Sequence, residues 1–207
     1  MKKLLTEFIG TFFLVFTIGL VVTQSVAMAP VAIGSILMVM VYMGGHISGA
    51  HYNPAVSLAV LVRGKSNLPE FVSYFATQVA GAFVAAVTVY VVTGKTFVPT
   101  PSSETLPALI VETLFTFALA LTILNVATSK ATAGNSYFGL AIGFTVLAGA
   151  FAGGPISGGA FNPAVGIGPA LCELFFGSAS ISHLWIYLVG PLLGGALAGV
   201  VFNIQEQ

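Results

Sequence analysis

The chain has 207 residues, of which 57% are hydrophobic and only 6% are charged, with six Lys and Arg against six acidic residues. Soluble domains average roughly 25% charged residues, so this composition excludes a water-exposed globular surface and places most of the protein surface in lipid. The absence of a basic cluster excludes nucleic-acid binding. A single cysteine excludes an internal disulfide and a cysteine-based metal site.

Six apolar segments are long enough to cross the roughly 30 Å hydrocarbon core of a bilayer as helices. In chain order they are Leu4–Ala27, Pro30–Gly49, Glu70–Val92, Leu106–Thr128, Tyr137–Gly154 and His183–Phe202. Two shorter apolar pieces, Asn53–Val62 and Asn162–Phe175, cannot span and are predicted to be re-entrant half-helices. The predicted fold class is therefore an all-α membrane protein with six transmembrane helices and two half-helices.

The start of the chain has some features of a secretory signal, because Lys2-Lys3 precede an apolar run. Glu7 interrupts that run, however, and the segment recurs 105 positions later, where Glu112 occupies the place of Glu7. We therefore expect the first helix to be retained. The matching positions in the first copy are Glu7, Thr11, Phe12, Leu14, Thr17, Ile18, Val21 and Thr23.

A second internal match relates Val31–Val56 to Leu140–Val165 at an offset of 109, and each copy contains Asn-Pro-Ala. The chain thus divides into repeats 1–94 and 106–207, joined by the polar stretch Lys95–Pro107. Because each repeat holds three spanning helices, an odd number, the second must enter the membrane in the opposite orientation. An inverted repeat of this kind forms a single channel domain over 1–207, with its special site near the bilayer midplane.

The distribution of basic residues orients this topology. With the N-terminus in the cytoplasm, five basic residues fall on the cytoplasmic side and only Lys95 lies outside, in agreement with the positive-inside rule. The five are Lys2, Lys3, Arg63, Lys65 and Lys130. We expect both termini in the cytoplasm and, from the short termini and basic start, a prokaryotic plasma membrane.

The two Asn-Pro-Ala motifs are the strongest functional signal in the sequence. Asn is a good N-cap and Pro suits the first helical turn, so helices are predicted to begin at Asn53 and Asn162. Inverted symmetry brings both positive helix ends to mid-membrane, where the two amides donate to permeating molecules. The non-helical lead-ins would line the pore with the carbonyls of Gly49, Ala50, His51, Tyr52, Gly158, Gly159, Ala160 and Phe161.

Two glutamates, Glu7 and Glu112, lie inside predicted spanning helices, where an ionisable group is costly and by default functional. We expect each to accept hydrogen bonds from backbone N–H groups of a re-entrant loop and so support that loop. A proton relay is the alternative role. Apart from these residues, the sequence contains no nucleophile–base pair, no phosphate-binding glycine loop and no metal cluster, so no enzyme activity, cofactor or metal is expected.

The motifs GHISGAHYNPAV, TEFIGTFFLVF and VETLFTFALAL resemble those of the aquaporin, or major intrinsic protein, family over essentially the whole chain. The resemblance implies one pore per subunit, a homotetramer, and passage of water and small neutral solutes. It also implies an outer filter at Ile33, Ala150, Gly159 and Val165. The family usually has arginine at the position of Val165, and this set has no charge, aromatic ring or side-chain donor.

Such a filter predicts a passive channel for water and small uncharged solutes, with urea, glycerol, ammonia and peroxide as candidates. A strict water channel is the first alternative. The second is an ion- or proton-leaky transporter, or a non-conducting membrane junction protein. Coupled transport would need titratable groups at the midplane, where only Glu7 and Glu112 are available, and a junction would need long outer loops.

Overall fold

The computed structural model describes residues 1–102, 104–178 and 180–206, so the last residue of the predicted second repeat lies outside it. Six of its helices are long and apolar enough to cross a membrane, and the protein is an integral membrane protein of the predicted all-α class. They are α1 (Lys2–Thr23), α2 (Ala29–Ser48), α4 (Leu68–Thr93), α5 (Thr105–Thr128), α6 (Phe138–Ser157) and α8 (Leu184–Gln205). A short 3₁₀ turn, η1 (Lys130–Thr132), follows α5.

The two short helices, α3 (Pro54–Val62) and α7 (Pro163–Phe176), begin directly after the asparagines of the two motifs. In each, the asparagine is the N-cap and its side-chain oxygen accepts a hydrogen bond from the backbone N–H of the alanine two residues later. The proline occupies the first helical position, where no N–H is needed. Local capping chemistry therefore fixes where both half-helices start.

Three helix ends differ by three or more residues from the sequence-based expectation, and one of them is the end of α8, which continues past Phe202 to Gln205. The first helix ends at Thr23 rather than Ala27, and Ser25 takes a positive φ of 53° that turns the chain toward α2. The fifth spanning helix continues past Gly154 to Ser157, and its last turn is closed by the bond from the Gly158 N–H to the Gly154 carbonyl. Apolar composition sets the length of a span, but these turns depend on backbone geometry that composition does not encode.

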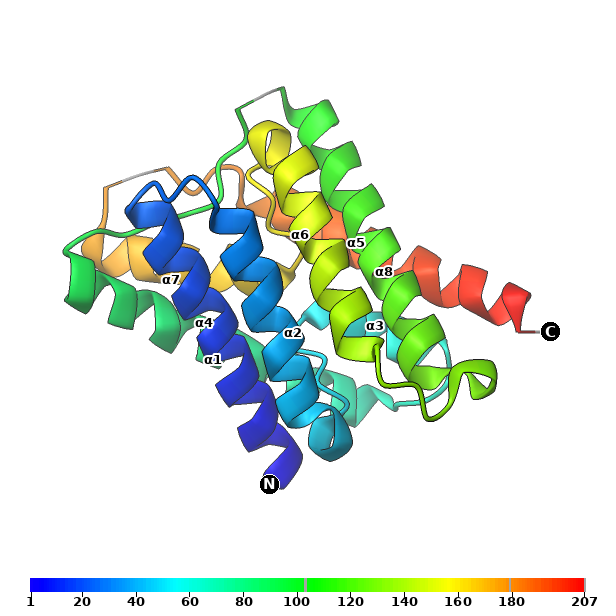
Figure 1. Cartoon of the computed structure of the whole chain (residues 1–207). Helices are drawn as coiled ribbons and strands as arrows, with labels where there is room; N and C mark the ends of the chain where they lie inside the picture. Colours follow the sequence, from blue (N-terminus) through cyan, green and yellow to red (C-terminus); the bar gives the residue numbers. More distant parts are fainter. Residues whose placement is uncertain (103, 179, 207) are drawn as a thin grey trace.

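The helices of the two halves are arranged in the same way but in opposite directions. Figure 1 shows α1 rising from the N-terminus, whereas α5 runs the other way along the bundle. The packing partners correspond, since α1 packs on α4 and α2 as α5 packs on α8 and α6. Each half-helix packs on a spanning helix of the other half, α7 on α4 and α3 on α8. We therefore propose that 1–94 and 106–207 form one inverted-repeat domain.

The halves meet closely where α2 crosses α6. A Cβ atom added at Gly34 would lie 2.6 Å from the Gly143 carbonyl oxygen, and one added at Gly143 would lie 2.5 Å from the Gly34 carbonyl oxygen. Glycine on both helices thus lets the backbones approach to a distance that no side chain permits, as is common between helices in lipid. This contact sets the spacing of the helices that line the centre of the protein.

We predict that Gly143→Ala lowers the free energy of unfolding by about 1–3 kcal/mol, because the new methyl group would overlap the backbone of α2. Gly154→Ala on the same helix is the matched control, since a Cβ there would meet nothing within 4 Å. It should leave stability unchanged or raise it slightly, because alanine favours a helix by roughly 1 kcal/mol. Denaturation in detergent micelles measures both, and equal effects would contradict the proposed role of the crossing.

Candidate functional site

The centre of the protein is formed by two short non-helical segments, 49–52 and 158–161, that lead into α3 and α7. Three residues in each segment have positive φ at corresponding positions. They are Gly49 (88°), Ala50 (51°) and Tyr52 (50°), and Gly158 (91°), Gly159 (66°) and Phe161 (48°). The left-handed conformation is unfavourable for residues with a side chain, so specific bonds must hold these lead-ins in place.

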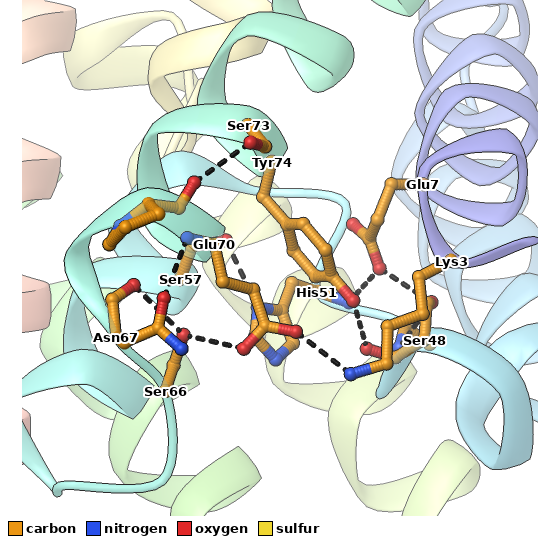
Figure 2. A network of polar contacts seen from close by, with 12 residues as sticks. Lys3, Glu7, Ser48, His51, Ser57, Ser66, Asn67, Glu70, Ser73 and Tyr74 are labelled. Carbon is orange, nitrogen blue, oxygen red and sulfur yellow. Dashed lines mark hydrogen bonds and ion pairs between the residues drawn. The ribbon is translucent and has the colours of Figure 1, made fainter. Parts of the chain in front are cut away.

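Glu7 supplies those bonds for the first lead-in. Its carboxylate accepts from the backbone N–H of His51 at 2.9 Å and of Tyr52 at 2.7 Å. The Ser48 hydroxyl at 2.6 Å and the Gln78 amide at 2.8 Å complete the set. Figure 2 shows the carboxylate of α1 reaching across to this segment. Because Glu7 is fully buried, its carboxylate oxygens depend on these protein donors for their hydrogen bonds.

Glu112 holds the second lead-in in the same manner. It accepts from the backbone N–H of Ala160 at 3.0 Å and of Phe161 at 2.7 Å, and from the Ser157 hydroxyl at 2.7 Å. Glu112 is also fully buried. Both glutamates therefore lie where loop support requires them, with their oxygens directed at backbone donors of the re-entrant segments.

The two motif asparagines bind the opposite lead-in across the pseudo-two-fold axis. The Asn53 amide donates to the Phe161 carbonyl at 2.9 Å, and the Asn162 amide donates to the Tyr52 carbonyl at 2.9 Å. Since an NH₂ group has two hydrogens, each amide retains one for another acceptor. Of the eight carbonyls expected to line a pore, those of Tyr52 and Phe161 are thus engaged in cross-linking the halves.

A narrow central cavity of about 30 Å³ lies beside these asparagines. A water molecule needs roughly 10–15 Å³, so the space suits about two molecules in single file. Eighteen residues line the cavity, nine from each half, and every one has its repeat partner in the lining. The pairs are Leu14/Leu119, Ile18/Ile123, Ile33/Ile142, Leu37/Val146, Ala50/Gly159, His51/Ala160, Tyr52/Phe161, Asn53/Asn162 and Val56/Val165.

An outer cavity of about 360 Å³ adjoins the central one on the side of Lys95. All four residues of the predicted filter, Ile33, Ala150, Gly159 and Val165, contribute to its lining. The connector between the halves also covers it, through residues 97–100. The structure thus brings the four predicted filter positions together, although they come from three separate parts of the chain.

An inner cavity of about 580 Å³ adjoins the central one at the opposite end, on the side of Lys130. His51, Ile123 and Ile142 border both the inner and the central cavity, whereas the outer and central cavities share Ile18, Ile33, Gly159 and Val165. The three cavities therefore form a series through the helix bundle, with the asparagines in the middle.

The sequence-based site omitted the apolar side of the central cavity. Leu14, Leu119, Ile18 and Ile123 come from α1 and α5, and they occupy matched positions of the 105-residue repeat. The match of these residues between the repeats was the one sequence signal for a cavity lining. Conserved core packing in the two halves would produce the same match, so the signal does not identify a lining. Within the described residues, no group of three or more His, Cys, Asp or Glu side chains could hold a metal ion.

Comparison with known proteins agrees with this geometry. Residues 1–202 match the family model described as "Major intrinsic protein". The chain is 36% identical to aquaporin NIP1-1 of Zea mays, over 98% of this chain and 74% of that protein. It is 35% identical to nodulin-26 of Glycine max, over 99% and 78%. The X-ray structure of the aquaglyceroporin from Plasmodium falciparum is similar with a TM-score of 0.85 and 25% identity, covering 98% and 95%.

Loop support by the glutamates is testable with Glu112→Gln. An amide has only one acceptor oxygen, so its NH₂ group would face a backbone N–H of the lead-in and leave that donor without an acceptor. We therefore expect the free energy of unfolding to fall by about 1–3 kcal/mol. Glu70→Gln is the control, because Glu70 pairs with Lys3 at the exposed rim and should cost no more than about 1 kcal/mol. Denaturation in detergent measures the unfolding free energy of both variants. Equal decreases would contradict the role of Glu112 in supporting the lead-in.

Proposed function

Because the chain belongs to the major intrinsic protein family, we propose that it is a passive channel for water and small uncharged solutes. The observation that carries this proposal is the series of three cavities through the bundle, with Asn53 and Asn162 at the middle one. The central cavity is wide enough for single-file water and is bordered by both polar and apolar groups. Movement down a gradient through such a path involves no covalent chemistry.

We propose that the N-termini of α3 and α7, where the two helices meet, exclude cations. Both helices direct their N-termini toward the centre, and each contributes a partial positive charge of roughly half a unit. The remaining amide hydrogen of Asn53 and of Asn162 donates to a passing oxygen. The free carbonyls of residues 49–51 and 158–160 are proposed as the acceptors on either side.

The outer filter is proposed to admit more than water. Ile33, Ala150, Gly159 and Val165 provide no charge, and they border a cavity of about 360 Å³. Urea, glycerol, ammonia and peroxide are therefore candidate solutes, and the similarity to an aquaglyceroporin supports including glycerol. A strict water channel is the alternative, and parallel solute measurements separate the two.

The environment of the buried glutamates weakens the case for a proton relay. Glu7 accepts four hydrogen bonds and Glu112 accepts three, all from groups that fix the lead-ins. A relay would need these carboxylates to release and rebind protons, which would break the bonds that shape the centre. A scaffold role is therefore favoured over coupled transport.

We further propose a homotetramer with both termini on the cytoplasmic side. Lys3 pairs with Glu70 and Arg63 pairs with Glu206, so the start of α1 and the ends of α3 and α8 gather with the basic residues on one face. That face is the cytoplasmic one under the positive-inside rule. The two sequence relatives compared above, from Zea mays and Glycine max, are plant proteins, which lends no support to the expected prokaryotic plasma membrane.

The first test is flux through the purified protein in liposomes, followed by light scattering after water, urea and glycerol gradients. We expect rapid flux of water together with at least one larger solute. Flux of water alone would favour the strict water channel. No flux above that of empty liposomes, with the assembled protein intact, would overturn the proposed channel function.

Val165→Arg tests the filter directly. The long cationic side chain has room in the outer cavity and would narrow it, so urea and glycerol flux should fall more than water flux. Val165→Leu, which adds bulk without charge or hydrogen-bond donors, is the matched control and should have the smaller effect. The same liposome assay measures both, and equal losses for all solutes, or none, would mean that Val165 does not border the permeation path.

A further inference from the structure

The central cavity is almost symmetric, and one pair of residues breaks the symmetry most. Five of its nine pairs are identical, and three of the others exchange side chains of similar character, such as Leu37 for Val146. The exception is His51, which corresponds to Ala160 in the second half. An imidazole ring in the first half thus corresponds to a single methyl group in the second half.

This asymmetry lies at a junction between cavities. The outer junction contains Ile18 and Ile33, and their repeat partners Ile123 and Ile142 form the corresponding inner junction. His51 borders the inner junction, whereas Ala160 is absent from the residues shared at the outer one. The same isoleucine pair is therefore present at both ends of the central cavity, but only the inner end carries a ring.

The inner isoleucines are also more enclosed than the outer ones. Ile123 and Ile142 are 6% and 3% exposed and belong to the buried core, whereas Ile18 and Ile33 are only partly buried and pack against that core. The outer junction instead contains Gly159 and Val165, which are smaller than an imidazole. Equal isoleucines that are less exposed, together with a ring in place of Gly159 and Val165, favour the inner junction as the tighter of the two.

The His51 ring is fixed in position by its neighbours, as Figure 2 shows. Its Nδ1 atom is hydrogen-bonded to the Ser57 hydroxyl at 3.0 Å, and the ring lies edge-on to Tyr74 with centroids 5.1 Å apart. Gln78 donates to the same hydroxyl at 3.1 Å and also to Glu7 at 2.8 Å. The second half has Gly166 in place of Ser57, so this bracing exists only on the inner side.

From these observations we infer that the inner junction of His51, Ile123 and Ile142, and not the outer four-residue filter, sets the upper size limit for permeating solutes. This inference rests on the proposed channel function. The outer filter has one isoleucine and no ring, so on this inference a molecule that enters it meets its narrowest passage only beyond the asparagines. There, two packed isoleucines and a braced ring cannot move apart at low cost, because the surrounding core is close-packed.

The repeat supplies a matched pair of variants for the test. Ile142→Ala widens the inner junction, and Ile33→Ala makes the same change at the corresponding outer position. In liposomes, the glycerol-to-water permeability ratio should rise several-fold more for Ile142→Ala than for Ile33→Ala. Neutral polyols of increasing length, tested in the same assay, should show a higher size limit only for the inner variant.

His51→Ala is the second variant, because it gives the inner junction the residue that the outer half has at Ala160. It too should raise the glycerol-to-water ratio by more than Ile33→Ala does. If Ile142→Ala does not assemble, Ile142→Val removes one methylene and should raise the ratio in the same direction by a smaller factor. Ratios for the inner variants that stay at the parent value, or a larger rise for Ile33→Ala, would overturn the inference.

The two proposals fail in distinguishable ways. A parent protein that conducts no water ends the channel function and this inference with it. A parent that conducts water, but whose solute ratio responds only to the outer substitution, ends the inner size limit alone. In that case the outer filter would determine selectivity, and the proposed channel function would stand.

Discussion

The structure depends on holding non-helical backbone at the middle of a membrane, where the surrounding lipid offers no hydrogen-bond partners for its N–H and C=O groups. Two buried carboxylates meet this constraint, Glu7 for residues 49–52 and Glu112 for residues 158–161. Each binds consecutive N–H groups whose residues include one at positive φ, and so offsets the strain of that conformation. With these N–H groups directed at the glutamates and the Tyr52 and Phe161 carbonyls bound by the asparagines, the carbonyls of residues 49–51 and 158–160 are the ones proposed as acceptors for permeating molecules. Two buried carboxylates would thus support the polar side of the path.

The cross-repeat bonds of the asparagines turn two such segments into one site. The side-chain oxygen of Asn53 caps its own half-helix, and its side-chain nitrogen donates a hydrogen bond to the lead-in of the other half. Asn162 makes the two corresponding bonds from the second half. Each side chain therefore sets both the start of a helix and the distance between the halves. Because the same groups border the cavity, the stability of the fold and the width of its centre are linked. A substitution that weakens these bonds should therefore change both the stability of the fold and the width of the central cavity.

The sequence predicted most of the fold because its strongest signals are local. Asparagine followed by proline specifies a helix start from neighbouring residues alone, so both half-helices begin where expected. The end of α1 was placed four residues too late, at Ala27, because an apolar run does not reveal the positive φ of Ser25. The four predicted filter positions line one cavity, but their spacing from Asn53 and Asn162 came from a family resemblance and not from local physics. The inner junction was missed because Ile123 and Ile142 look like ordinary core residues until the cavities show what they border.

Inverted repetition explains both the strength and the limit of such reasoning. A duplicated half builds a path with equal ends, and five identical residue pairs in the central cavity reflect that origin. The two ends of such a path are equally wide, however, so a size limit at one end alone must come from the positions where the halves differ. Val165 is identical to its repeat partner Val56 and so adds no difference on the outer side, whereas His51, the repeat partner of Ala160, adds one on the inner side. Since neither position is a lysine or an arginine, we propose that the exclusion of ions rests on the paired helix ends and on the apolar walls. The helix ends would repel cations through their partial positive charge, whereas the apolar walls would repel any hydrated ion because they cannot replace the water that it would lose.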